Sequence, residues 1–263
     1  MKKMKLAVLL TAFMAMVGLS SCMGESDPYT TAMEIMKVDG YMGFYSFRSA
    51  GGYTVNPTNA ADLTASLESG KYAHVTYKFD TRTVTQGAKK LDAEILGLMP
   101  IDDMEPANGN TEPNAPIMGM VNSDGSLWYS DKAMFFDKTN IFINVGYFYR
   151  YSSKPEERQA ELDKHAFYLY TLTSEEDKDV NEKTTVLRLV HIVKDPENNK
   201  ERTATGYETH HVNLSQYISG EPDKIIIKFD QSSSSSMDNA SDNKVEINYK
   251  SIINNYFSNS SAM

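Results

Sequence analysis

Cysteine and tryptophan are nearly absent from this chain of 263 residues, which has one of each. A single cysteine, Cys22, excludes any disulfide bond within the chain, so the folded part has to be held together by its hydrophobic core. Hydrophobic residues make up 41% of the chain and charged residues 23%, which are ordinary values for a globular protein. The composition therefore supplies such a core.

Positive charge is also scarce, with 26 basic residues against 35 acidic ones and a formal net charge of −9. Removing residues 1–21 would take away three lysines and no acidic residue, so this charge would fall from −9 to −12. Because proteins bind nucleic acids by neutralising phosphates with lysine and arginine, we expect no nucleic-acid partner. A basic patch that attaches the chain to a membrane surface is excluded for the same reason.

The sequence lacks the motifs of common catalytic sites. No Gly-x-Ser-x-Gly elbow, glycine-rich phosphate loop or His-Glu-x-x-His helix occurs. Acidic clusters at 102–105 and 174–179 fall in expected loops, where water keeps every carboxylate ionised. We therefore predict that the chain is not an enzyme, with no catalytic residue and no cofactor.

Five histidines are present, and the run "ETHH" is the densest group of metal-binding residue types. In a strand, Glu208 and His210 lie on one face and His211 on the other, so at most two ligands converge locally. Zinc takes three or four protein ligands. His165 and His191 join this group only if their strands pair nearby. We predict no metal site and interpret these histidines as members of sheet faces.

A hydrophobic run long enough to span a membrane is missing as well. Residues 6–19 form an uncharged apolar run after three lysines, which has the length of a signal peptide and falls short of the roughly 20 residues of a spanning helix. The tetrad "LSSC" that follows resembles the bacterial lipobox, at which a signal peptidase cuts just before the cysteine. An ordinary secretory signal is the alternative.

The lipobox resemblance implies that Cys22 becomes the lipidated N-terminus and that acyl chains anchor the protein in a membrane. Met23 is not the aspartate associated with retention in the inner membrane, so we expect the outer membrane. Glu25 and Asp27 loosely resemble the acidic export signal of Bacteroidetes lipoproteins. The periplasmic side and the cell surface both stay open.

Beyond this region the hydrophobic pattern has a period of two, which indicates strands. In "KYAHVTYKF" (71–79), the side chains of Ala73, Val75, Tyr77 and Phe79 fall on one face. The same alternation occurs at 141–151, 165–172, 205–214, 224–229 and 244–250. The segment 184–193 is apolar on both faces and is predicted to be a central strand. Short helices are expected only at 59–70 and 154–165, so the predicted fold class is all-β.

Two polar segments interrupt the strands. Residues 100–119 contain four prolines and no apolar period, which indicates a long loop or a linker between domains. Residues 231–244 are rich in serine and lie between two expected strands, which is typical of a flexible hairpin loop. The strand spacing predicts a small barrel before the first break and a β-sandwich after it.

Three successive strands resemble the C-terminal part of the NigD-like lipoproteins of Bacteroidetes. The family's features are a Lys-His-x-Phe-x-Leu strand, a Leu-x-Leu-x-His strand that ends in acidic residues, and a strand that closes in an Asp-Leu-Ser turn, in which this chain has Asn in place of the more usual Asp. The matching positions are Lys164, His165, Phe167 and Leu169; Leu187, Leu189, His191 and Asp195; and Asn213, Leu214 and Ser215. "LESGKYAHVTYKF" and "AEILGLMPI" resemble the N-terminal domain of that family.

This resemblance implies an OB-like β-barrel followed by a β-sandwich, and it implies no catalytic residue. The expected parts are a lipoprotein signal peptide (1–21), a tether (22–31), the OB-like barrel domain (32–105), a linker (106–119) and the β-sandwich domain (120–263). The family takes its name from a bacteriocin gene cluster, which suggests a link to such systems.

The function predicted from these observations is a lipid-anchored, non-catalytic binding or accessory protein of the bacterial outer membrane. The membrane is the expected partner through the lipid, together with a protein or glycan that the sequence does not identify. A pilus or adhesin subunit and a glycan-binding surface lipoprotein are the alternatives. Tyr147, Tyr149 and Tyr151 alternate along one strand, and such a row either stacks on a ligand or packs across the sheet.

The lipobox predicts that the variant Cys22→Ser accumulates as an uncleaved precursor without lipid, because the thiol that carries the diacylglyceryl group is missing. Metabolic labelling with a fatty acid and the mobility of the protein on a denaturing gel measure both effects. Normal cleavage of the variant, together with its partition into detergent, would contradict the lipobox.

Overall fold

The computed structural model describes residues 27–41, 44–63, 68–85, 87–107, 111–121 and 134–257. The chain divides into two compact units, residues 1–101 and 102–263, and each unit has its own hydrophobic core. Cys22 and the expected signal peptide lie outside the described residues. In the described part, no helix is long and apolar enough to cross a membrane.

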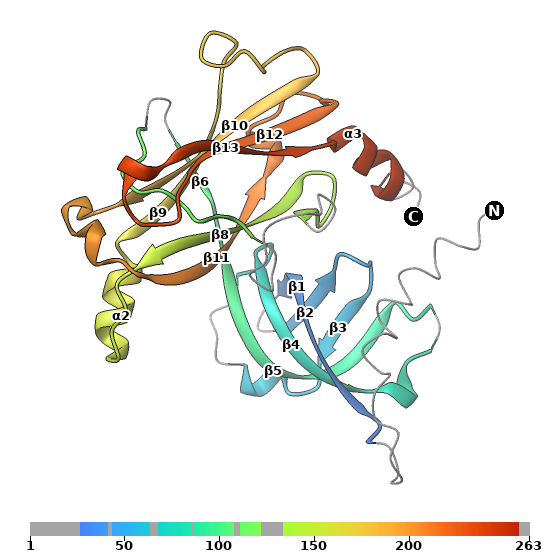
Figure 1. Cartoon of the computed structure of the whole chain (residues 1–263). Helices are drawn as coiled ribbons and strands as arrows, with labels where there is room; N and C mark the ends of the chain where they lie inside the picture. The colour runs from blue at the N-terminus through green and yellow to red at the C-terminus, as the bar shows by residue number, and fades with distance from the viewer. Residues whose placement is uncertain are drawn as a thin grey trace. The chain divides into compact units, whose positions relative to one another are not determined.

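The first unit is a barrel. Its strands are β1 (Tyr29–Tyr41), β2 (Phe44–Ser49), β3 (Thr54–Pro57), β4 (Tyr72–Asp80) and β5 (Lys90–Asp103), of which β5 runs on into the second unit, and two 3-10 turns are η1 (Ala60–Asp62) and η2 (Thr81–Thr83). The strands pair in the order β3-β2-β1-β4-β5, and a parallel pairing of β3 with β5 closes the barrel (Figure 1). A closed five-stranded barrel of this kind is OB-like, as predicted.

The alternation predicted for β4 is confirmed, because Ala73, Val75, Tyr77 and Phe79 are all buried in the barrel core. Gly70 precedes this strand with a positive φ of 90°, and its backbone N–H donates to the carbonyl oxygen of Val38. Glycine adopts this backbone conformation without steric cost, which is the reason for its place at the turn into the strand.

Two expectations for the first unit differ from the structure. Of the helix expected at 59–70, the described residues form only the single turn η1, and residues 64–67 lie outside the description. Residues 29–31, expected in the tether, already pair with β4 as the start of β1. Their side chains alternate between exposed and half-buried, a pattern that the flanking polar residues hide in the sequence.

The second unit is a sandwich of two sheets, as predicted. Its further strands are β6 (Glu105–Pro106), β7 (Gly119–Met120), β8 (Asn140–Tyr149), β9 (His165–Thr171), β10 (Thr184–Val193), β11 (Ala204–Asn213), β12 (Lys224–Gln231) and β13 (Ser241–Ile247). Its helical pieces are α2 (Pro155–Leu162), η4 (Pro196–Glu201), η5 (Leu214–Gln216), η6 (Met237–Asn239), α3 (Tyr249–Ile252) and the π-turn η7 (Ile253–Phe257). The helix α2 confirms the one expected at 154–165, with Pro155 in its first turn.

One sheet has the order β7-β8-β11, and the last two residues of β5, Asp102 and Asp103, pair with β11 at its edge. The other sheet has the order β13-β12-β10-β9-β6. Strand β10 lies between β9 and β12 and is buried on both faces, which confirms its predicted central place.

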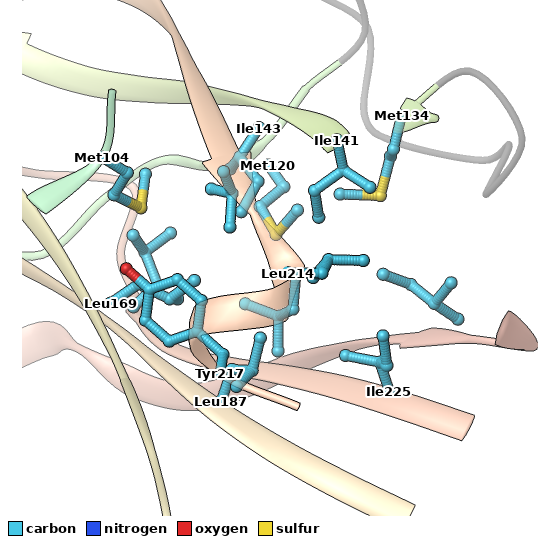
Figure 2. Packing of buried hydrophobic residues seen from close by; sticks show 14 of the residues in the cluster. Met104, Met120, Met134, Ile141, Ile143, Leu169, Leu187, Leu214, Tyr217 and Ile225 are labelled. Atoms are coloured by element: carbon cyan, nitrogen blue, oxygen red, sulfur yellow. The ribbon is translucent and has the colours of Figure 1, made fainter. Parts of the chain in front are cut away.

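The inner faces of these two sheets meet in one core. Ile141 and Ile143 of β8 pack in the same cluster as Leu187 of β10 and Ile225 of β12, all of them without solvent exposure. Figure 2 shows these side chains pointing toward one another from opposite sheets, with Met104 and Met120 filling the space between them. Each such side chain contributes about 1.5–3 kcal/mol on burial. The core therefore provides the stability that disulfide bonds provide in many small exported proteins.

The expected linker at 106–119 is incorrect for its described residues, which belong to the second unit. Ile117 is buried, and its backbone N–H donates to the carbonyl oxygen of Asp230. Asn114 donates its side-chain amide to the carbonyl oxygen of Val193 at 2.9 Å. Proline lacks a backbone N–H and so limits regular strand pairing in this segment. The carbonyl oxygens of Ile117 and Met118 accept hydrogen bonds from Ser232 and Gln231, which are distant in the sequence.

The serine-rich segment joins β12 to β13 in an antiparallel hairpin, as expected, but it is not a loose loop. Ser232 and Ser235 are buried, and the hydroxyl of Ser235 donates to the carbonyl oxygen of Asn199 at 2.6 Å. Ser236 accepts a hydrogen bond from the backbone of Asp238 at the start of η6. Short polar side chains thus fix the backbone of this segment.

Strand β13 provides a direct test of the sandwich. Ile247 is fully buried while its neighbour Glu246 is exposed and pairs with Lys224 and Lys244, each at 2.7 Å. Ile247→Ala should lower the free energy of unfolding by about 2–5 kcal/mol, because it leaves a cavity between the sheets. The control Glu246→Ala should cost less than about 1 kcal/mol, as exposed ion pairs do.

Urea unfolding of the two variants measures this difference. Equal and small effects would mean that the last strand is not part of the core.

Candidate functional site

Three of the five histidines meet in the core of the second unit. His165 begins β9 and His191 lies on β10, and the ring nitrogens Nδ1 of His165 and Nε2 of His191 are 2.9 Å apart. Phe167 stacks on the ring of His191 with 4.6 Å between centroids, and the ring of His210 from β11 lies 5.1 Å from Phe167. We refer to His165, His191, His210 and Phe167, together with Tyr147 of β8, as the histidine cluster.

A backbone carbonyl fixes the protons in this cluster. The oxygen of Pro116 lies 3.1 Å from Nδ1 of His191 and can only accept, so this nitrogen carries the proton and donates it. Nε2 of His191 is then an acceptor, and Nδ1–H of His165 donates to it. Nε2 of His165 is left as a bare acceptor nitrogen, 3.7 Å from a carboxylate oxygen of Glu161. Both rings are neutral in this arrangement.

The predicted division of the "ETHH" run between two faces is confirmed. His210 points into the core beside Glu208, with 3.5 Å between Nε2 and the nearest carboxylate oxygen. His211 points the other way, where its Nδ1 lies 2.7 Å from the carboxylate of Asp103 and its Nε2 lies 2.9 Å from the side-chain oxygen of Asn140. The run therefore contributes His210 to the core and His211 to the opposite face of the sheet.

Burial keeps the histidines of the cluster uncharged. It lowers the pKa of His191 to about 3, and the nearby His165 and Arg202 oppose a positive charge there as well. It lowers the pKa of His165 to about 4, again with a contribution from Arg202. The pKa of His210 falls to about 4 for the same reason. Imidazoles of such low pKa bind few protons near pH 7, so they are poor general acids.

A buried ion-pair network lies beside the cluster. The carboxylate of Glu161, on α2, accepts from Nε of Arg202 at 2.7 Å and lies 3.3 Å from Nζ of Lys164. Asp195 pairs with Lys164 at 2.6 Å and with Arg202. Burial on its own would raise the pKa of Glu161, but Arg202 and the hydrogen bonds from Lys164 and the Arg150 backbone outweigh it and hold this pKa below its usual value.

The pKa values of Glu208 and Asp195 move in opposite directions, and a third carboxylate, that of Asp177, pairs with a lysine. Burial raises the pKa of Glu208, with the nearby Asp102 as a second cause, and Tyr147 donates a hydrogen bond to it. Lys164 and Arg202 overcome the burial of Asp195 and lower its pKa. Asp177, from the second acidic cluster of the sequence, pairs with Lys228 at 2.5 Å. The ion pair of Asp177 links its loop to β12, although the sequence indicated only solvated carboxylates for this acidic cluster.

The tyrosine row is part of this packing. Tyr147 is buried in contact with His165, Phe167 and His191, and Tyr149 packs against the same core. Tyr151 is exposed beyond the end of β8. The structure agrees with packing across the sheet for Tyr147 and Tyr149, whereas the exposed Tyr151 takes no part in that packing.

The described side chains of the histidine cluster and the ion-pair network pack against one another and pair within the fold, as core residues do. Among the described residues, no group of three or more His, Cys, Asp or Glu side chains is placed to hold a metal ion. Lys164, His165, Phe167, His191 and Asp195, which carry the resemblance noted above, form the cluster and the ion-pair network. Sequence reasoning missed Glu161 and Arg202, because nothing in the surrounding pattern marks either as buried.

Comparisons with known proteins agree on the fold. No protein-family model matches the chain, and none of the curated proteins matches it. Among solved structures, a candidate lipoprotein from Bacteroides fragilis is similar over 84% of this chain and 98% of its own, with 22% identity and a TM-score of 0.67. A candidate toxin-related protein from Parabacteroides distasonis covers 86% of this chain and 98% of its own, with 13% identity and a TM-score of 0.53.

A NigD-like immunity protein from Bacteroides caccae also matches, over 81% of this chain and 91% of its own, with 15% identity and a TM-score of 0.47. The first two likenesses show a two-domain, all-β fold that this chain shares with proteins of Bacteroides and Parabacteroides. The resemblance to Bacteroidetes lipoproteins predicted from the motifs is thus confirmed for the fold.

The neutral histidines predict how stability depends on pH. Each has a folded-state pKa below the ordinary value of about 6.5, so the unfolded chain binds more protons between these two values. Their contribution to stability is complete above about pH 6.5 and is lost as the pH falls toward 4. The free energy of unfolding should therefore fall between pH 7 and pH 5, by about 2 kcal/mol for each histidine.

The variant His210→Phe places a ring of similar size against Phe167 and removes one of the three titrating groups. The loss of stability between pH 7 and pH 5 should shrink by about 2 kcal/mol in this variant. Urea unfolding at the two pH values measures it. An unchanged pH dependence in the variant would show that His210 is not held neutral by the core.

Proposed function

We propose that this chain is a lipid-anchored, non-catalytic binding protein of the bacterial outer membrane. The observation that carries the proposal is the tetrad "LSSC" ending at Cys22, directly after a run of signal-peptide length. The fold adds support, because a protein described as a candidate lipoprotein shares it over 98% of its length. With one cysteine in the chain, the thiol is free to serve as the attachment point for acyl chains.

The non-catalytic part of the proposal rests on the histidine cluster. The groups that would serve as acids and bases in an enzyme are buried here, neutral or paired with partners of opposite charge. A general base needs a pKa near the working pH and access to a substrate. The cluster provides neither, which supports the non-catalytic part of the proposal.

The alternative of a pilus subunit, which donates or accepts a strand, has less support. Strand β13 pairs with β12 of the same chain from Ser241 to Ile247, and α3 follows it into the core with Tyr249 buried. Because β13 already has its partner strand within the same chain, the domain does not need a strand from a second copy. This favours a domain that functions without strand exchange.

Membrane fractionation tests the proposal. After separation of inner and outer membranes from the native bacterium, the protein should sediment with the outer membrane. A wash at high salt should not release it, because acyl chains hold the protein and the acidic chain is not bound through charge. Recovery with the inner membrane, or release by salt, would contradict the proposal.

A further inference from the structure

A groove in the second unit runs beside the serine-rich segment that joins β12 to β13. Its volume is about 620 Å³, which lies within the range of small-ligand sites, about 300–1,000 Å³. Met118 and Phe148 provide its apolar lining, and Gln231, Ser232 and Ser233 are among its polar lining residues. The described residues that line the groove are all uncharged, although the chain as a whole is strongly acidic.

Four polar side chains of this groove are exposed and available to a ligand. Thr205 lies opposite Phe148 in the ladder of β8 and β11, and Ser233, Asn239 and Ser241 come from the hairpin segment. Among the described interactions, the hydroxyl and amide groups of these four side chains make no hydrogen bond. Three hydroxyls and one amide thus face the same space, and each of them both donates and accepts.

The backbone around the groove is fixed before any ligand arrives. The side-chain amide of Gln231 donates to the carbonyl oxygen of Met118 at 2.7 Å. The backbone N–H of Ser232 donates to the carbonyl oxygen of Ile117 at 3.0 Å. Since little of this segment has to be ordered on binding, the entropic cost of occupying the groove is small.

An exposed aromatic ring lies on the same sheet face as Thr205. Tyr207, two residues further along β11, is 54% exposed and pairs with Gly146 of β8. A Cβ atom at Gly146 would come within 3.4 Å of the Tyr207 ring, so the glycine lets this ring lie close against the sheet. The ring adds a flat apolar surface with a polar tip next to the hydroxyl-lined groove.

We propose that this groove binds an uncharged saccharide. A sugar ring has an apolar C–H face for Phe148, Met118 or Tyr207, and hydroxyl groups at its edge for the four free side chains. A phosphate or carboxylate ligand would lose its hydration without a counter-charge in the groove, which is costly. This inference rests on the proposed binding role and names its ligand class.

The test is a binding measurement with uncharged oligosaccharides of several sugar types, using calorimetry on the full chain purified in detergent. Sulfated and sialylated oligosaccharides serve as the charged comparison. We expect at least one uncharged oligosaccharide to bind and the charged ones to bind more weakly. The double variant Ser233→Ala with Asn239→Ala should weaken that binding about tenfold, because it removes two hydrogen-bonding groups from the groove.

Ser251→Ala is the matched control, since Ser251 is an exposed hydroxyl of α3 that does not line the groove. It should leave the affinity unchanged, and thermal unfolding checks that each variant is folded. Tyr207→Ala, which removes the exposed ring and keeps all the hydroxyls, tests the apolar contact separately.

Three results would overturn the inference: no binding of any uncharged oligosaccharide, equal affinity in the double variant, or a preference for charged glycans. None of them bears on lipid anchoring, which the membrane fractionation measures independently on cells.

Discussion

The meeting of two sheet faces around Ile141, Leu187 and Ile225 is the interaction on which the second unit depends. With one cysteine in the chain, covalent cross-links contribute nothing to it, and stability has to come from apolar area removed from water. Every strand of the sandwich except β6 therefore contributes at least one buried apolar side chain to this core. The barrel of the first unit meets the same demand on its own, with Tyr77, Phe47 and Met36 fully buried inside it.

The same packing explains why polar groups occur in the core. Histidine rings that pack on Phe167 add aromatic contact area. Both nitrogens of His191 and Nδ1 of His165 are satisfied by one another and by the carbonyl oxygen of Pro116, whereas Nε2 of His165 and Nε2 of His210 have no hydrogen-bond partner among the described residues. A buried charge would be costly, so the rings stay neutral and the charges nearby are paired, as Glu161 is with Arg202. The requirements of burial thus account for the pairing of these polar groups.

Sequence reasoning predicted the local features of this fold and missed the long-range ones. Alternation along β4 and β13 is visible within a few residues, and the two-face arrangement of His210 and His211 follows from it directly. The convergence of His165 and His191 with His210 was not predictable, because it depends on which strands pair and which sheet lies opposite. The proline-rich segment is ordered by long-range contacts such as the hydrogen bond from Ile117 to Asp230. This was not predictable either, because it depends on which distant segments meet in the fold.

The central claim of the proposed function is that the chain carries its lipid anchor at Cys22, ahead of the folded residues. Mass spectrometry of the N-terminal peptide from the native protein tests this most directly. We expect a peptide that begins at Cys22 and carries glyceryl-linked acyl chains. A peptide that begins at another residue, or an unmodified Cys22, would contradict the account.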